Sequence, residues 1–260
     1  MGGLKGIGCF DSGAGGLTVV RRILQERPDA AVTYLADGIH WPYGERSMAQ
    51  VGGFTRRGVE RLEAEGLGPV VIACNTGSVA WPAEERPAGS DVIDMLAPVR
   101  AEIARRAPER VLVLATRATV DSGRYLSAMQ AACPATHFTQ VAAQDLVSLV
   151  EQGNWTQDSA LASARSALAK APRADLVVLA CTHFGAVTEV FEELLGDARV
   201  LDPGVLVARR ALAAGPIPAG ELRLLTTGRD LRRLRRAALR ILGHLGRPVR
   251  VERVEEVVAP

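Results

Sequence analysis

Two cysteines stand out because each follows a strand-like apolar run and precedes polar residues. Val70–Ala73 leads into Cys74, and Leu176–Ala180 leads into Cys181. The reactive form of cysteine is the thiolate, which forms at neutral pH only beside a proton acceptor or another feature that favours negative charge, such as a helix N-terminus. Both thiols are therefore candidate acid–base groups. Cys9 and Cys133 lack this context and are typical of buried structural cysteines.

Three ionisable residues are candidate proton partners for these thiols. Asp11 follows the first strand-like run, Gly6–Phe10, and His183 stands two residues after Cys181. Glu151 closes an apolar helical stretch that begins at Leu146. Each also fits a structural role on its own: Asp11 as a helix cap, His183 as a loop residue and Glu151 as a solvated helix end.

Short polar side chains gather at other predicted strand ends. They are Ser12, Asn75, Thr76, Thr116, Thr119 and Thr182. The glycine-rich segment 11–16 follows a strand and opens a helix, but it does not satisfy the dinucleotide-binding pattern GxGxxG. Its bare backbone N–H groups predict a pocket for a small anionic ligand such as a carboxylate.

Composition excludes several classes of protein. The 260-residue chain is 48% hydrophobic, with a net charge of +2, and no apolar run approaches the about 20 residues of a membrane helix. Lys5 and Lys170 are the only lysines, and neither belongs to a phosphate-binding loop or a convincing pyridoxal site. The four histidines, among them His244, show no zinc-ligand spacing. We therefore expect no cofactor and no metal. The four scattered cysteines indicate a reducing, cytoplasmic location.

Strand-like runs alternate with stretches of helical period, which predicts an α/β protein with parallel sheets. The helical stretches include segments around Leu17–Leu24, Val99–Ala107 and Leu161–Leu168. The predicted strands are Gly6–Phe10, Ala31–Leu35, Val70–Ala73, Asp91–Met95, Val111–Ala115, Leu176–Ala180, Val200–Leu201 and Leu222–Leu225.

An internal sequence similarity predicts two similar lobes. Segment 70–76 resembles segment 177–183, and the strand end at Phe10-Asp11-Ser12 has a counterpart at Ala115-Thr116. Ligands of open α/β sheets bind beyond the carboxyl ends of strands, so two facing lobes would present one thiol each to an active site between them. We place the first lobe at residues 1–97 plus 208–260 and the second at residues 98–207.

The segment Leu231–Arg253 is rich in arginine, which raises a nucleic-acid-binding alternative. Behind the arginines lies a predicted apolar stripe formed by Leu231, Leu234, Ala238, Leu239 and Leu242. A stripe of this kind is typical of an ordinary amphipathic helix with a solvated face. We therefore expect neither a nucleic-acid nor a membrane partner, and leave open whether the chain forms a homodimer.

Longer motifs resemble the cofactor-independent aspartate/glutamate racemase superfamily, and within it the glutamate racemases. They are FDSGAGGL at Phe10–Leu17, Asp37 followed by Pro42-Tyr43-Gly44, ACNT at Ala73–Thr76, LATRATVDSGRY at Leu114–Tyr125, LVSLVEQG at Leu146–Gly153 and ACTH at Ala180–His183. They occur in the order found in the family and span most of the chain.

The resemblance implies racemisation of glutamate by two bases, without cofactor, to supply D-glutamate for peptidoglycan. Cys74 would act on D-glutamate with help from Asp11, and Cys181 on L-glutamate with help from His183 and Glu151. The implied substrate contacts are Asp11, Ser12, Tyr43, Gly44, Asn75, Thr76, Thr116, Thr119, Thr182 and His183. Inversion at Cα needs an acid and a base on opposite faces, which agrees with two thiols at equivalent places.

Some positions depart from the family pattern and leave substrate preference open. They are Gly77 after ACNT, Phe184-Gly185 after ACTH, His40-Trp41 before PYG, and Asp94. The alternatives are an aspartate or broader amino-acid racemase of the same superfamily and, from another class, a non-catalytic partner-binding or DNA-binding protein on a racemase scaffold.

Overall fold

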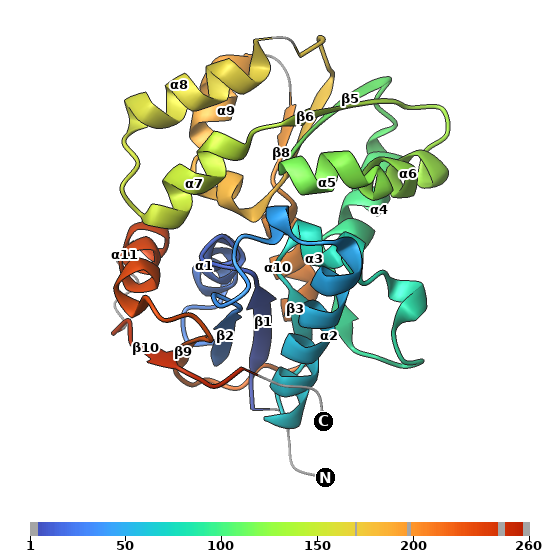
Figure 1. Cartoon of the computed structure of the whole chain (residues 1–260). Coiled ribbons are helices and arrows are strands. Elements are labelled where there is room, and N and C mark those ends of the chain that lie inside the picture. Colours follow the sequence, from blue (N-terminus) through green and yellow to red (C-terminus); the bar gives the residue numbers. More distant parts are fainter. Residues whose placement is uncertain (1–4, 170, 197–198, 244–247, 257–260) are drawn as a thin grey trace.

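Two parallel β-sheets, one in each lobe, form the framework of the molecule (Figure 1). The computed structural model describes residues 5–169, 171–196, 199–243 and 248–256. Residues 1–4 and 257–260 of the predicted first lobe, together with Lys170 and His244, lie outside the described residues.

The first sheet has six parallel strands in the order β10-β9-β2-β1-β3-β4. Its central strand β1 pairs with β2 on one side and with β3 on the other. The strands are β1 (Ile7–Asp11), β2 (Val32–Ala36), β3 (Val70–Ile72), β4 (Val92–Ile93), β9 (Leu222–Thr226) and β10 (Val251–Arg253).

The second sheet has four parallel strands in the order β6-β5-β7-β8. They are β5 (Arg110–Ala115), β6 (His137–Ala142), β7 (Leu176–Ala180) and β8 (Arg199–Leu201). The order β2-β1-β3-β4 in the first sheet repeats as β6-β5-β7-β8 in the second. The internal sequence similarity predicted that the strands before Cys74 and Cys181 are equivalent. The topology agrees, because β3 and β7 occupy the same place in the two sheets.

Helices cover both sheets and join them. They are α1 (Leu17–Glu26), α2 (Met48–Ala64), α3 (Asn75–Ala80), α4 (Leu96–Arg106), α5 (Arg117–Ser122), α6 (Arg124–Ala132), α7 (Gln144–Gln152), α8 (Gln157–Leu168), α9 (Thr188–Leu195), α10 (Pro203–Ala213) and α11 (Leu231–Leu242). Three short 3₁₀ turns are η1 (Tyr43–Glu45), η2 (Ala83–Glu85) and η3 (Thr182–Ala186). The helix α10 packs against both β3 and β7, and so lies between the lobes.

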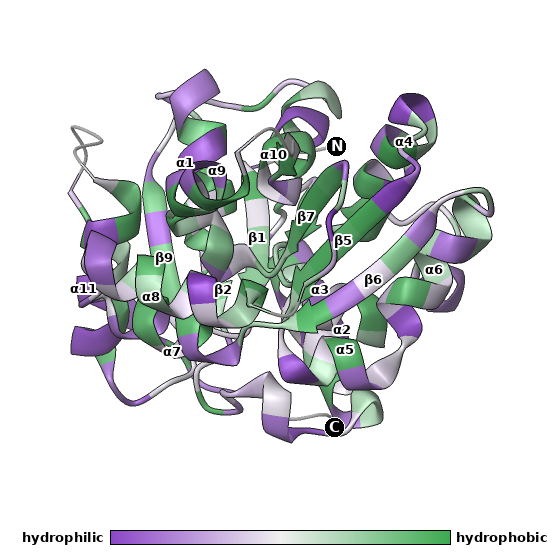
Figure 2. Cartoon of the chain, turned by 90° about the horizontal axis from the view of Figure 1, so that it is seen from above, coloured by the Kyte–Doolittle hydropathy of each residue, from purple (hydrophilic) through white to green (hydrophobic). Residues whose placement is uncertain are grey.

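One continuous apolar core runs from the first sheet into the second. The central strands β5 and β7 are buried along almost their whole length and are strongly hydrophobic (Figure 2). A second core lies on the other face of the first sheet, where Phe10 and Ile72 pack beneath Val59 and Leu62 of α2. Strands buried on both faces explain why the predicted runs were continuously apolar rather than alternating.

The eight strands predicted from sequence all exist, with ends shifted by one or two residues. Two further strands, β6 and β10, were missed. Neither forms a buried apolar run: β6 alternates exposed and half-buried residues, and β10 is largely exposed. Both lie at sheet edges, where one side of the strand needs no partner and the apolar signal is weak.

The arginine-rich helix α11 is amphipathic as predicted, but the prediction that Leu239 belongs to its apolar stripe is wrong. Leu239 is 51% exposed, whereas Leu234, Ala238 and Leu242 are buried together with Ile241. The helical period places residue 239 on the opposite side from this stripe. In the described part of the chain, no helix is long and apolar enough to cross a membrane.

Asp94 explains one departure from the family pattern, because it anchors the helix α4 through which the chain enters the second sheet. Its Oδ1 accepts hydrogen bonds from the N–H groups of Leu96 and Ala97, both at 2.8 Å. Its Oδ2 pairs with Arg86 at 3.0 Å, and both side chains are less than 10% exposed. A helix start and a buried cation thus depend on one carboxylate.

We predict that Asp94→Ala lowers the free energy of unfolding by about 3 kcal/mol, because it leaves the guanidinium of Arg86 buried without its partner. Urea unfolding followed by circular dichroism measures this change. Asp94→Asn, which keeps an acceptor for the helix N–H groups, should lose less. Equal stability of wild type and Asp94→Ala would contradict the assignment.

Candidate active site

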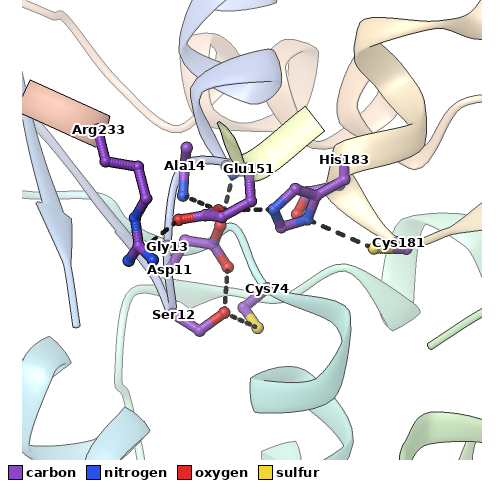
Figure 3. A network of polar contacts seen from close by, with 12 residues as sticks. Asp11, Ser12, Gly13, Ala14, Cys74, Glu151, Cys181, His183 and Arg233 are labelled. Carbon is purple, nitrogen blue, oxygen red and sulfur yellow. Dashed lines mark hydrogen bonds and ion pairs between the residues drawn. The ribbon is translucent and has the colours of Figure 1, made fainter. Parts of the chain in front are cut away.

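Cys74 lies at the carboxyl end of β3 and begins the short helix α3. Its sulfur accepts a hydrogen bond from the N–H of Gly77 at 3.3 Å and lies 3.8 Å from the hydroxyl of Ser12. Ser12 in turn donates to Oδ1 of Asp11 at 3.4 Å. A chain of polar contacts therefore joins Asp11, at the end of the neighbouring strand β1, to the Cys74 thiol (Figure 3).

Cys181 lies at the equivalent end of β7 in the second lobe. Its sulfur is 3.6 Å from Nδ1 of His183, and Nε2 of His183 is 2.8 Å from Oε2 of Glu151. Cys181, His183 and Glu151 are all less than 5% exposed. The second thiol thus has its own chain of acid–base groups, which Figure 3 shows approaching the cavity from a different side than Asp11 and Ser12.

The glycine-rich loop after β1 packs directly against Glu151 and His183, the acid–base groups beside Cys181. The N–H of Ala14 donates to Oε2 of Glu151 at 2.8 Å, and the N–H of Gly16 donates to Asp11 at 2.6 Å. A side chain at Gly13 would collide with the Glu151 carboxylate, and one at Gly15 with the His183 ring. The anions bound by these N–H groups are thus carboxylates of the protein itself, whereas the sequence suggested an anionic ligand.

Burial sets the protonation of the first pair. It raises the pKa of the Cys74 thiol well above its ordinary value, and the nearby charge of Asp11 raises it further. Burial also raises the pKa of Asp11, although His183 and the N–H of Gly16 partly oppose this shift. At neutral pH Cys74 is therefore a thiol. Cys9 contacts none of these groups, and burial alone raises its pKa to about 12.

The second thiol has the opposite electrostatic environment. Burial by itself lowers the pKa of His183, but its hydrogen bonds to Cys181 and Glu151 and their negative charges outweigh burial and raise that pKa well above the ordinary value. His183 is therefore an imidazolium at neutral pH. The protonated Nδ1 of this ring, 3.6 Å from Sγ of Cys181, can donate a hydrogen bond to that sulfur.

Both sulfurs open onto one cavity between the lobes, with a volume of about 30 Å³. The cavity is lined by Asp11, Ser12, Trp41, Pro42, Tyr43, Gly44, Cys74, Asn75, Thr76, Thr116, Gln144, Val147, Cys181, Thr182 and His183. Of the residues expected from sequence, Glu151 and Thr119 do not line it. Glu151 reaches it through His183.

Thr119 supports the cavity wall from behind. Its hydroxyl lies 3.0 Å from those of Thr76 and Thr116, which are 3.3 Å from each other. Asn75 differs from this closed cluster. It is buried, and neither its amide nitrogen nor its amide oxygen has a hydrogen-bond partner among the described residues. Such an unpaired amide costs free energy unless a ligand binds it.

Two other departures from the family pattern have local explanations. A side chain on Gly77 would come within 2.9 Å of the Thr55 hydroxyl, so glycine suits the neighbour present here. His40 stacks on Phe54 with ring centroids 3.7 Å apart and contacts Asp37 at 2.8 Å.

Sequence reasoning did not identify every residue of the site. Among the cavity-lining residues, Gln144 belongs to no motif, Val147 lies within LVSLVEQG but was not singled out, and Trp41 was noted only as a departure. Tyr34, from the middle of β2, donates to the carbonyl of Gly13 at 2.6 Å and lies 3.3 Å from Asp11. A tyrosine inside an otherwise apolar strand was the available signal, because a buried hydroxyl needs a partner.

Comparison with known proteins agrees with this arrangement. A family model described as Asp/Glu/Hydantoin racemase matches residues 18–211. A glutamate racemase of Gloeobacter violaceus is 37% identical over 214 residues, which cover 81% of this chain and 80% of that protein.

Two crystal structures superpose over nearly the whole molecule. Glutamate racemase isoform RacE1 of Bacillus anthracis has a TM-score of 0.84 and 26% identity, covering 98% of this chain and 99% of that one. Glutamate racemase of Thermus thermophilus, in complex with β-chloro-D-alanine, has a TM-score of 0.81 and 32% identity, covering 96% of each chain. The predicted α/β fold and the predicted resemblance are thereby confirmed. The chain belongs to the Asp/Glu/hydantoin racemase family and, within it, to the isomerases of the glutamate racemase type.

Proposed function

We propose that the chain interconverts L- and D-glutamate by two-base proton transfer between Cα and the thiols Cys74 and Cys181. The observation that supports this most is the pair of sulfurs at topologically equivalent strand ends, facing one cavity and each joined to separate acid–base groups. Inversion requires removal of a proton from one face of Cα and delivery of another to the opposite face.

The two halves of the site place different groups beside their thiols. In the direction from L- to D-glutamate, Cys181, with His183 beside its sulfur, accepts the Cα proton of L-glutamate as the thiolate. On the Cys74 side, the protonated thiol donates to the other face and leaves D-glutamate. For the reverse reaction, Cys74 first passes its proton toward Asp11, whose raised pKa suits it to accept one, and Cys181 takes a proton from His183, which it then delivers to the opposite face of Cα.

The intermediate carbanion has no pyridoxal ring to spread its charge, so the cavity itself must stabilise it. The unpaired amide of Asn75 and the hydroxyls of Thr76 and Thr182 supply fixed donors around the space. In a small cavity from which water is excluded, such donors act at low dielectric, where electrostatic stabilisation is strongest.

Glutamate is favoured over other amino acids by the relatives. The relatives that match this chain at 32% and 37% identity, from Thermus thermophilus and Gloeobacter violaceus, are named glutamate racemases, and the one from Thermus thermophilus was solved with β-chloro-D-alanine. The DNA-binding alternative has less support, because three arginines of α11 are engaged with the second lobe.

The product D-glutamate would serve bacterial peptidoglycan synthesis. A cytosolic location keeps both working cysteines reduced.

Proton NMR of D-glutamate in D₂O tests the proposed reaction directly. With purified, pyridoxal-free protein, the Cα–H signal should disappear while L-glutamate appears, because the proton delivered to the opposite face comes from solvent. Loss of the signal without inversion would mean that only one base works. No exchange with glutamate, but exchange with aspartate, would replace the proposed substrate.

Cys74→Ser and Cys181→Ser should each lower kcat by at least about 100-fold, because a serine hydroxyl is a far weaker acid than a thiol and supplies almost no anionic base at neutral pH. Cys133→Ser, at a buried cysteine that lies outside the cavity, is the matched control and should keep normal turnover. Either active-site variant retaining most of its activity would rule out the two-thiol scheme.

The raised pKa of His183 predicts how its contribution to stability depends on pH. Because the folded-state pKa exceeds the unfolded value of about 6.5, the protonated ring contributes fully below that pH and loses its contribution as pH rises through the folded-state pKa. The difference in unfolding free energy between wild type and His183→Asn should be largest near pH 6 and shrink at alkaline pH. A difference that grows with pH would contradict this charge state.

A further inference from the structure

Arg233, near the start of α11, contacts two parts of the molecule at once. Its guanidinium lies 3.6 Å from Oε1 of Glu151 and stacks over the Trp41 ring at 4.6 Å. The side chain is 27% exposed, whereas that of Glu151 is 2% exposed. Figure 3 shows Arg233 reaching Glu151 from the side opposite to His183. The arginine itself does not line the cavity shared by the two sulfurs.

The Glu151 carboxylate has unequal partners for its two oxygens. Oε2 accepts from Ala14 N–H and contacts His183, both at 2.8 Å. Among the described residues, the ion pair with Arg233 is the only polar contact recorded for Oε1. A buried carboxylate with one unanchored oxygen can rotate away from the imidazolium. At 3.6 Å the guanidinium of Arg233 is beyond hydrogen-bond distance, but its charge attracts Oε1 and so opposes this rotation.

Two further arginines on the same face of α11 hold the polypeptide that carries Glu151. Nε of Arg236 donates to the carbonyl of Gln152 at 2.8 Å, and Arg240 donates to the carbonyl of Trp155 at 3.4 Å. Positions 233, 236 and 240 share one side of a helix. This arrangement docks α11 onto the carboxyl end of α7, where a positive charge is favourable. Arg232 and Arg235 are exposed on other faces.

We propose that Arg233 is a positioning residue for proton transfer by Cys181: it holds the carboxylate of Glu151 in the orientation that keeps His183 directed at the sulfur. The inference rests on the proposed two-thiol reaction and adds to it a residue from the first lobe that orients the acid–base groups of the second. In this proposal, the arginines on this face of α11 serve to position Glu151 rather than to bind nucleic acid.

Electrostatics and positioning predict opposite pH effects when Arg233 is replaced. The titratable groups that face His183 are Cys181, Glu151 and Asp11, with Arg233 behind Glu151. If the arginine acted only as a nearby cation, its loss would stabilise the imidazolium and move the alkaline limb of the kcat profile to higher pH. If it positions Glu151, its loss weakens the hold on the imidazolium and moves that limb to lower pH.

The experiment compares Arg233→Gln with Arg232→Gln and Arg235→Gln, which make the same charge change on the same helix. We expect Arg233→Gln to lower kcat for glutamate by about tenfold or more. KM should change less than kcat, and the alkaline limb should move to lower pH. The two controls should match wild type in all three quantities. Arg233→Lys, which retains a positive charge beside Glu151, should fall between wild type and Arg233→Gln.

Several results would overturn the proposal. They are an unchanged kcat in Arg233→Gln, a loss that appears mainly in KM through the cavity wall at Trp41, an alkaline limb that stays in place or rises, and an equal loss in either control. Thermal melting of each variant identifies a folding defect, in which case Arg233→Lys decides the outcome. Inactive wild-type protein would instead refute the proposed reaction, so the two failures are distinguishable.

Discussion

The geometry of the active site depends most on the contacts made by the buried carboxylate of Glu151. An ionised carboxylate removed from water is costly unless several donors surround it. Here the donors come from both lobes: the backbone of Ala14 and the guanidinium of Arg233 from the first, and His183 from the second. The Glu151 carboxylate thus links the two lobes by polar contacts and holds the imidazolium beside Cys181.

The glycines after β1 make this contact possible. Gly13 and Gly15 leave the loop without side chains where it meets Glu151 and His183, so that the backbone N–H of Ala14 reaches the carboxylate. The same loop binds Asp11 through Gly16. One short segment thus holds the acid–base groups of both thiols, and a movement of this loop would disturb both.

The repeated four-strand topology presents two thiols in equivalent places, but their surroundings differ. Cys74 lies near a carboxyl group and keeps its proton, while Cys181 lies beside a cation. In the proposed reaction, one thiol accepts a proton while the other donates one, and the two exchange these roles when the direction reverses. The repeated strand order places the two thiols at equivalent positions, and the neighbouring residues give them different electrostatic surroundings.

The sequence by itself determined the α/β class, the positions of the buried strands along the chain and most of the cavity-lining residues, because buried parallel strands have continuous apolar runs and polar residues follow their carboxyl ends. It also indicated the proton partner of each thiol, but by resemblance rather than by periodicity. The edge strands β6 and β10 escaped detection, since half-exposed strands lack that apolar signal. Only the tertiary structure decided that Arg233 and the Ala14 backbone converge on Glu151. These residues lie 82 and 137 positions from Glu151, and no local pattern encodes a contact that forms only when the two lobes pack together.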